Sequence, residues 1–266
     1  MAPVRSPFAN GAGRGLAAAG RMTSDGPHRP YPAPRSPWAM RMVWEDLMFE
    51  HWPLEPKVLR PLVPAGLELE TWDGMAWIGV VPFRMRGVRA RGVPALPWLS
   101  AFPELNVRTY VRAGGKPGVW FFSLDADQPV AVAAARRLFH LNYLWAAMSC
   151  RRAGDAVAYR SRRRGAHGGG AEYRANYWAL PATVDTARGT LGDFLVNRYC
   201  LYAADAKGRL FRGEIDHAPW PLREAVAEVT VDTMTRPLGF ELPAREPLRW
   251  FAPRLEVVAW LPERVG

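Results

Sequence analysis

Lysine, cysteine and long apolar runs are scarce in this 266-residue chain. Its lysines are Lys57, Lys116 and Lys207, so arginine supplies nearly all of the 35 basic residues. A coding bias toward arginine explains this pattern as readily as phosphate binding does, so the net charge of +10 is weak evidence for a nucleic-acid partner. No stretch approaches the roughly 18–20 apolar residues of a membrane-spanning helix. With 49% hydrophobic residues, the composition is that of a globular protein without a membrane partner.

Familiar binding and catalytic motifs are also missing. Cys150 and Cys200 lie far apart without a partner motif, which indicates reduced thiols in a cytoplasmic protein. No two histidines have the spacing of a zinc site. There is no GxSxG elbow, no Walker A loop and no GxGxxG turn after a strand. We therefore expect neither a metal nor a cofactor.

The N-terminal region differs from the rest of the chain. Residues 1–37 are rich in proline, glycine, alanine and arginine and have few large apolar side chains, so we expect a disordered tail. An extension upstream of a start at Met22, Met40 or Met42 explains it better than a transit peptide, because no amphipathic helix is evident. Residues 38–266 are expected to form a single domain.

That domain is dominated by strand patterns separated by turns. The expected strands are Val43–His51, Leu67–Trp72, Met75–Met85, Glu104–Arg112, Gly118–Asp125, Tyr143–Arg152, Ala156–Arg163, Glu172–Leu180, Tyr199–Ala203, Leu210–Ile215, Val226–Val231 and Arg254–Leu261. The expected helices are Pro56–Leu62, Gln128–Phe139 after an Asp127 cap, and Thr190–Asn197. Strands joined by turns favour antiparallel pairing, so we predict a mainly β fold, either a barrel or two packed sheets.

One strand carries polar side chains at alternate positions. Glu104, Asn106, Arg108 and Tyr110 share one face of the strand Glu104–Arg112. That face is either a solvent face with an exposed Glu–Arg pair or the interior face of a ligand-holding barrel. In the second case the arginine fork grips a carboxylate and the glutamate acts as an acid or base. Periodicity alone leaves both open.

Isolated histidines and one arginine cluster have two interpretations each. His51, His140 and His217 stand in apolar or aromatic surroundings and are either structural or proton-transferring. The arginines form a solvated strand face or, as the less favoured alternative, contact phosphate or nucleic acid. That cluster comprises Arg151, Arg152, Arg160 and Arg162–Arg164.

An ordered series of motifs resembles the YqjF family, also called DUF2071, over roughly residues 40–262. The motifs are Glu50-His51-Trp52, Val63-Pro64-Ala-Gly66-Leu67, Asp73-Gly74-Met-Ala-Trp77-Ile-Gly-Val-Val-Pro82-Phe83, Glu104-Leu-Asn106-Val-Arg108-Thr109-Tyr110-Val111, Gly118-Val-Trp-Phe-Phe-Ser-Leu-Asp125, Arg198-Tyr199 and His217-Ala-Pro-Trp220-Pro221-Leu222. The family is similar in fold to acetoacetate decarboxylase. The resemblance implies a largely antiparallel barrel with an interior pocket and a few flanking helices.

The same resemblance bears on catalysis. Decarboxylases of that superfamily form a Schiff base with one lysine of an adjacent pair, which lowers the amine pKa. The similar segment here places Tyr143 and Leu144 at those positions, and Glu104 resembles the superfamily's pocket acid. The superfamily's pocket arginine falls near His51, and Arg108 supplies the positive charge instead. We therefore expect chemistry without a catalytic lysine.

These observations define the candidate site. The candidate catalytic residues are Glu104, Tyr143 and His140. The candidate substrate-binding residues are Arg108, Asn106, Tyr110, His51, His217 and Arg198. We expect a small-molecule-binding barrel for an organic acid or carbonyl compound, acting as a lyase, dehydratase or tautomerase. The alternatives are a ligand-binding or sensing module without turnover and, less favoured, a phosphate or nucleic-acid binder that uses Arg151–Arg164. Whether the chain forms a homo-oligomer stays open.

Overall fold

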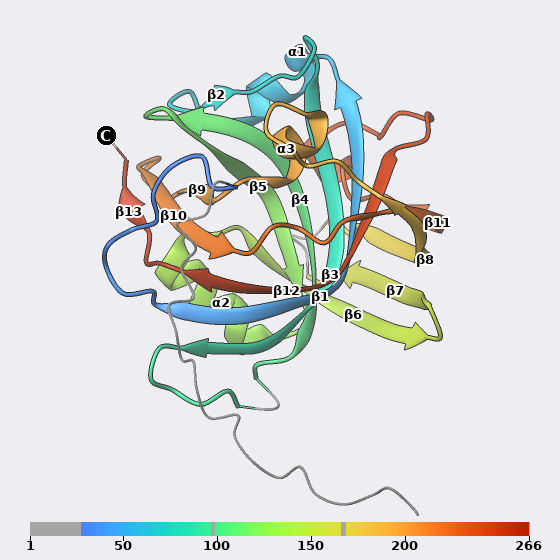
Figure 1. Ribbon diagram of the computed structural model, residues 1–266, viewed down its shortest axis with the longest axis horizontal. Coiled ribbons are helices and arrows are strands. Elements are labelled where there is room, and N and C mark those ends of the chain that lie inside the picture. Colours follow the sequence, from blue (N-terminus) through green and yellow to red (C-terminus); the bar gives the residue numbers. More distant parts are fainter. Residues whose placement is uncertain (1–27, 97–98, 166–168, 266) are drawn as a thin grey trace, which may run out of the picture.

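The computed structural model describes residues 28–96, 99–165 and 169–265. Its strands are β1 (Met40–Leu54), β2 (Glu68–Leu69), β3 (Ala76–Ala90), β4 (Phe102–Ala113), β5 (Lys116–Ala126), β6 (Tyr143–Ala153), β7 (Ala156–Arg163), β8 (Glu172–Thr183), β9 (Cys200–Ala204), β10 (Leu210–His217), β11 (Arg223–Asp232), β12 (Leu248–Ala259) and β13 (Glu263–Arg264). Its α-helices are α1 (Pro56–Leu59), α2 (Pro129–Phe139) and α3 (Leu191–Val196), and short 3₁₀ turns occupy Arg60–Leu62 and Arg236–Leu238 (Figure 1). The mainly β prediction is confirmed.

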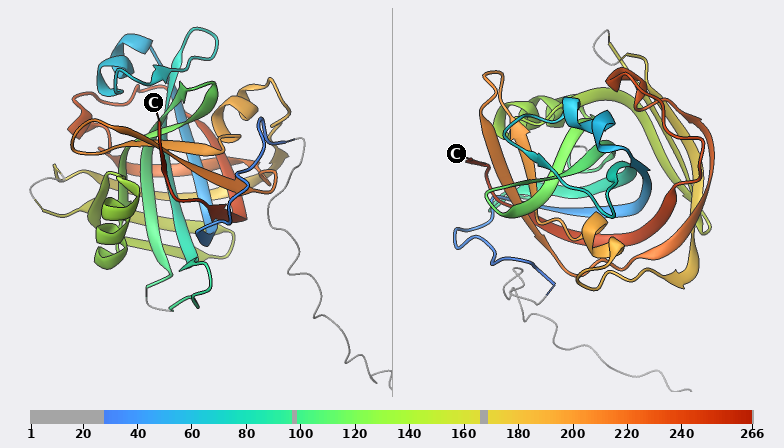
Figure 2. Two further views of the ribbon diagram at one scale, coloured as in Figure 1. Left: turned by 90° about the vertical axis from the view of Figure 1, so that its left-hand side faces the viewer. Right: turned by 90° about the horizontal axis from the view of Figure 1, so that it is seen from above.

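The strands form one sheet that closes on itself in two rings. The wide ring runs β5-β6-β7-β8-β11-β12-β1-β3-β4 and returns to β5. The narrow ring runs β5-β9-β10-β12-β1-β3-β4 and also returns to β5. Seen from above in Figure 2, the strands form a closed wall. Pairing is antiparallel except that β5 runs parallel to both β6 and β9. Helix α2 makes the crossover that a parallel β5–β6 pair needs.

The two rings share β1, β3, β4, β5 and β12, and long stretches of β1, β3 and β4 are buried on both faces. Leu105 and Val107 of β4 pack into the core inside the wide ring, together with tyrosines of β7 and β8. Tyr110 packs into a second core inside the narrow ring. The face of β4 that alternation left ambiguous is therefore an interior face, and the alternative of a solvent-exposed Glu–Arg pair is wrong.

Two local predictions differ from the structure. The Asp73-Gly74 turn forms with positive φ at both residues and is closed by a bridge between Trp72 and Met75. The strand before it, however, is only β2, which pairs with β4 rather than β3. Helix α2 is capped by the side chain of Gln128, which accepts a hydrogen bond from the Val130 amide, and not by the exposed Asp127.

Part of the expected disordered tail packs against the barrel. Arg29 is buried, and its guanidinium donates to the Ile215 carbonyl at 2.6 Å and pairs with Glu214 and Asp216 of β10. These carboxylates are nearly buried themselves, so they hold the segment because an unpaired buried charge is unfavourable. The prediction of disorder is therefore wrong for residues 28–37. Residues 1–27 lie outside the described part.

Candidate functional site

A cavity of about 440 Å³ lies inside the narrow ring. Each of its seven strands contributes lining side chains, among them Met42, Phe83, Glu104, Phe121, Leu201, Ile215 and Ala259. The start of β6, helix α2 and the β3–β4 connection complete the wall. The volume falls within the range of roughly 300–1,000 Å³ that small-molecule pockets occupy. Most of the lining is apolar, and the polar groups come from Arg89, Glu104, Asn106, Arg108 and Tyr143.

Glu104 and Tyr143 form a buried hydrogen-bonded pair at this cavity. The Tyr143 hydroxyl donates to Glu104 Oε2 at 2.9 Å. The pKa of Glu104 is raised to about 8, chiefly by burial and also by the nearby Asp125, although the Tyr143 hydrogen bond lowers it. Burial likewise raises the pKa of Tyr143 well above its usual value. Near pH 7, Glu104 is therefore largely protonated and able to donate a proton.

Asn106 and Arg108 follow Glu104 along the same face of β4. Arg108 donates to the Leu195 carbonyl at 3.3 Å, and its guanidinium lies 5.1 Å from the Phe49 ring centre. Arg108 Nε and Asn106 Oδ1 are buried and have no hydrogen-bond partner within the described residues. Buried polar atoms are rarely left unpaired in native proteins. Trp44 Nε1 is a further buried donor on the wall of this cavity without a partner among the described residues.

A buried ion pair, Asp125 with Arg163, lies close to Glu104. Asp125 and Arg163 are both buried, and Arg163 Nε lies 2.9 Å from each Asp125 oxygen. Arg163 also donates to Ser123 Oγ at 2.5 Å. Burial raises the pKa of Asp125 to about 6, although Arg163 lowers it. Strand patterning alone did not indicate this pair, because its members lie on strands separated by β6.

His51 and Tyr110 lie one layer outside the cavity. The Tyr110 hydroxyl and His51 Nε2 share a hydrogen bond of 2.7 Å, and both side chains are fully buried. Burial lowers the pKa of His51 well below its usual value, and the Arg108 charge lowers it further, so the ring is neutral. Neither residue lines the cavity. Tyr110 contacts Arg108 through its ring, at 5.7 Å from the guanidinium carbon.

His140, His217 and Arg198 are not brought to the cavity wall. His140 ends α2 in the left-handed conformation, and its ring packs 4.5 Å from that of Phe211. His217 stacks on Tyr199 at 4.6 Å, and burial lowers its pKa to about 4. Arg198 pairs with Glu70 and donates to the Phe194 carbonyl at 2.6 Å. Packing and pairing account for His140 and Arg198, whereas His217 Nε2 is buried without a hydrogen-bond partner among the described residues.

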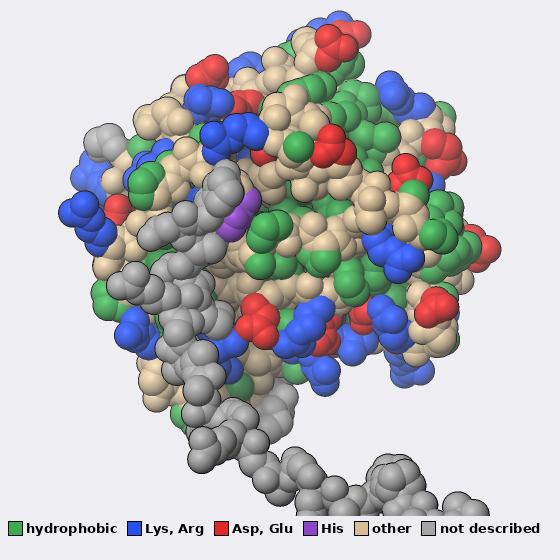
Figure 3. Space-filling view, viewed as in Figure 1, with side chains coloured by type: hydrophobic (Ala, Val, Ile, Leu, Met, Phe, Trp, Pro, Cys, Tyr) green, Lys and Arg blue, Asp and Glu red, His purple; other side chains and the backbone are tan. Residues whose placement is uncertain are grey.

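Only part of the arginine cluster shares one surface, because the register of β6 and β7 places the exposed Arg151, Arg160 and Arg162 on one face of this hairpin. Arg163 points inward to Asp125, and Arg152 pairs with Asp46 at 2.7 Å. Arg160 and Arg162 alternate outward on β7 and are exposed. On the face of the molecule that Figure 3 shows, basic and acidic side chains are interspersed. Strand alternation thus divides the run that the sequence presented as continuous.

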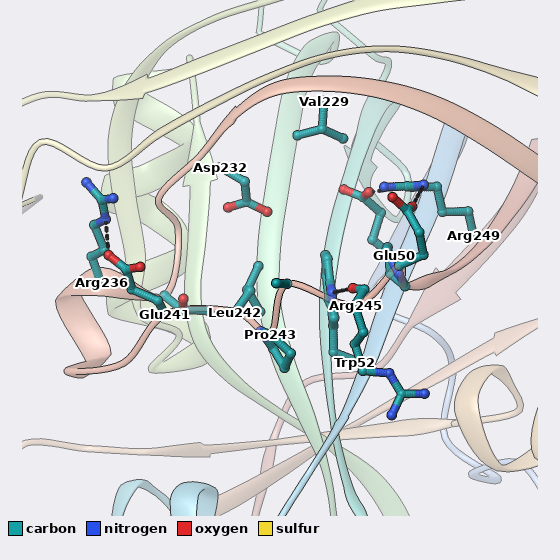
Figure 4. A pocket seen from close by; sticks show the side chains of 14 residues that line it. Glu50, Trp52, Val229, Asp232, Arg236, Glu241, Leu242, Pro243, Arg245 and Arg249 are labelled. Carbon is teal, nitrogen blue, oxygen red and sulfur yellow. Dashed lines mark hydrogen bonds and ion pairs between the residues drawn. The ribbon is translucent and has the colours of Figure 1, made fainter.

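A smaller cavity of about 240 Å³ lies beside the loop between β11 and β12 (Figure 4). Glu50 is satisfied there by the Tyr173 hydroxyl at 2.7 Å and by Arg249 at 2.9 Å. The pKa of Asp232 is raised to about 7, chiefly by burial and also by Glu50, and its Oδ2 has no hydrogen-bond partner among the described residues. The volume is below the small-molecule range and Glu50 is already paired, so of these two cavities the larger one, inside the narrow ring, is the better candidate site.

Searches for a metal cluster and for a membrane span give no candidates in the described ranges. No group of three or more His, Cys, Asp or Glu side chains in residues 28–96, 99–165 and 169–265 is arranged to hold a metal ion. No helix in these ranges is long and apolar enough to cross a membrane. All three lysines of the chain are described, and none of them lines the larger cavity.

Known structures share this fold. Acetoacetate decarboxylase from Legionella pneumophila superposes with a TM-score of 0.62 at 12% identity, over 94% of this chain and 98% of that one. An acetoacetate decarboxylase-like enzyme from Sphingomonas wittichii superposes with a TM-score of 0.61 at 14% identity, over 87% and 94%. The enduracididine biosynthesis enzyme MppR, complexed with pyruvate, also gives 0.61 at 14% identity, over 87% and 91%. At these identities the similarity establishes the fold alone.

Sequence comparison establishes the family. The chain is 43% identical over 223 residues to the uncharacterized protein YqjF of Bacillus subtilis. This alignment covers 84% of this chain and 91% of that protein. The DUF2071 family model, described as an uncharacterized conserved protein, matches residues 41–256. The chain therefore belongs to the DUF2071 family.

Proposed function

We propose that the larger cavity binds a small organic acid or carbonyl compound, and that Glu104 exchanges a proton with it. The observation that carries the proposal is the pair of unpartnered buried atoms, Asn106 Oδ1 and Arg108 Nε, beside a protonated Glu104. A carboxylate or carbonyl oxygen accepts from Arg108, and a hydroxyl or amide of the ligand donates to Asn106. MppR, a protein of the same fold, binds pyruvate.

The reaction classes that suit these groups are tautomerisation, dehydration and lyase chemistry. Glu104 acts as the general acid, and Tyr143 holds its carboxyl group in place through their 2.9 Å hydrogen bond. Arg108 stabilises negative charge that develops on the ligand oxygen. His51 and Tyr110 support Arg108 from the layer behind it, and His140, His217 and Arg198 are not part of the proposed chemistry. A binding or sensing module without turnover uses the same groups, and product formation distinguishes the two.

Arg108→Ala tests recognition of the ligand's head group. We expect small carboxylic acids and ketones to raise the melting temperature of the parent protein, because a ligand that binds only the folded state stabilises it. In Arg108→Ala the affinity should fall about 10- to 100-fold, as for the loss of a charge-assisted hydrogen bond. Arg86→Ala, on β3 but outside the cavity, is the matched control and should bind like the parent. Equal stabilisation of all three proteins by the same ligands would contradict the proposal.

Reduction with borohydride tests the expected absence of a catalytic lysine. Lys57 is exposed beside Glu55, Lys116 pairs with Glu214, and Lys207 lies in the turn before β10. Incubation with pyruvate and borohydride should therefore leave the protein mass unchanged, as in a control without pyruvate. A stable adduct mapped by mass spectrometry to any of these lysines would reverse the conclusion.

A further inference from the structure

Polarity along the larger cavity runs opposite to the usual arrangement, in which apolar groups are inside and polar groups face solvent. Glu104 is only 2% exposed and Asn106 only 5% exposed. Large apolar side chains are open to solvent at the rim instead, since Val93, Leu96 and Val130 are 51%, 43% and 56% exposed and all three line the cavity. The half-buried Arg89, at the end of β3, is the charged lining residue nearest in sequence to this rim.

The exposed rim is unusual within this molecule. Among the described residues six large hydrophobic side chains are exposed, and three of them belong to this one cavity. They come from two separate segments, the β3–β4 connection and the first turn of α2. Apolar groups exposed together beside a pocket mark a surface that an apolar ligand covers.

Between the rim and the polar end, the wall is mostly apolar, and Trp44 Nε1 is its unpaired polar atom among the described residues. Trp44, Phe83 and Trp220 line it, with methionines from β1 and β3 and leucines from β5 and β9. Trp44 packs edge-on against Phe83 and stacks on Trp220, at centroid distances of 5.8 and 5.9 Å. A ligand of two or three carbons would satisfy only the polar end and leave this wall uncovered.

We propose that the ligand is an amphiphile: an organic acid or carbonyl compound with a hydrocarbon tail of about six to ten carbons, bound head first. Its head meets Arg108, Asn106 and Glu104, and its tail follows the apolar wall to Val93, Leu96 and Val130. This inference rests on the proposed function of the same cavity and adds the length and direction of the ligand.

A series of carboxylates of increasing chain length tests how long a hydrocarbon tail the cavity binds. The probes are acetate, butanoate, hexanoate, octanoate and decanoate, titrated by calorimetry below their micelle concentrations. Each added methylene that enters the wall should lower Kd by about fourfold, and the gain should end once the tail passes the rim. Equal Kd values from butanoate to decanoate would overturn the proposal that the ligand is an amphiphile. If Arg108→Ala still weakened butanoate in that case, the proposed function would stand without it.

Variants of the rim test the direction of binding. The double variant Leu96→Asn with Val130→Asn should weaken decanoate about tenfold or more and leave butanoate unchanged, because only a long tail reaches the rim. Leu261→Asn, an exposed leucine outside the cavity, is the matched control and should change neither. Both rim side chains are exposed, so we expect the double variant to fold like the parent, as its melting curve will verify. If the double variant lost affinity for butanoate and for decanoate to the same extent, the proposal of head-first binding would be overturned.

Discussion

Arg163→Ala is expected to lower the free energy of unfolding by about 3–5 kcal/mol at pH 8. The substitution leaves Asp125 buried without its partner, and Arg163 currently touches both Asp125 oxygens and Ser123. Removing one member of a buried pair is far more damaging than removing both, because the remaining charge is neither solvated nor neutralised. Urea denaturation followed by tryptophan fluorescence measures the loss.

The loss in Arg163→Ala should depend on pH. Burial already raises the Asp125 pKa to about 6, and loss of the Arg163 charge raises it further. A raised folded-state pKa means that stability is lost as pH rises, so the variant should be closer to the parent at pH 5 than at pH 8. Arg162→Ala, the exposed neighbour on β7, is the matched control and should stay within about 0.5 kcal/mol of the parent. The double variant Asp125→Asn with Arg163→Ala should recover part of the loss. A loss no greater than that of Arg162→Ala would show that the pair does not stabilise the fold.

Glu104→Gln is expected to become more stable than the parent above pH 8. The pKa of Glu104 is about 8 in the folded protein against 4.5 as its ordinary value. The folded parent therefore keeps a proton that the unfolded chain releases, and its stability falls as pH rises from about 4.5 to 8. The shift corresponds to roughly 3–5 kcal/mol at most, and glutamine, which carries no proton to lose, is free of this penalty.

Urea denaturation at pH 4, 6, 8 and 9 tests this difference. The two proteins should be similar at pH 4, where the Glu104 carboxyl is largely protonated in both states, should diverge up to about pH 8, and should keep a nearly constant difference toward pH 9. Other buried acids contribute to the slope of both proteins, so only the difference between them is assigned to Glu104. Glu228→Gln, exposed on β11, should follow the parent at every pH. Parallel profiles for Glu104→Gln and the parent would mean that Glu104 ionises normally, and its role as a general acid would fall with it.

The sequence predicted several local elements of this fold. The hairpin of β4 and β5 was predicted from two strand-forming segments around a glycine turn, and β7 was predicted with the observed bounds. Helix α3 followed its Thr190 cap, whose side chain accepts from the Asp193 amide at 3.1 Å. Each depends on residues within a few positions of one another, which is the range that propensity and turn chemistry describe.

The sequence did not predict the contacts between segments that lie far apart in the chain. Alternation placed Glu104, Asn106 and Arg108 on one face of β4, yet whether that face met solvent depended on closure of the narrow ring by β9, β10 and β12. The inward turn of Arg163 and the packing of Arg29 likewise depend on partners far along the chain, Asp125 and the β10 carboxylates.

By itself the sequence determined the mainly β class, the local hairpins and the polar series on β4, because short-range periodicity and turn residues encode them. Only the tertiary structure decided which of those polar groups share a cavity. In the structure the Tyr143 hydroxyl donates a hydrogen bond to Glu104, and His140, His217 and Arg198 do not line the cavity. The physical reason is that two rings enclose long stretches of β1, β3 and β4, and the alternation of one strand does not say which distant strands close each ring.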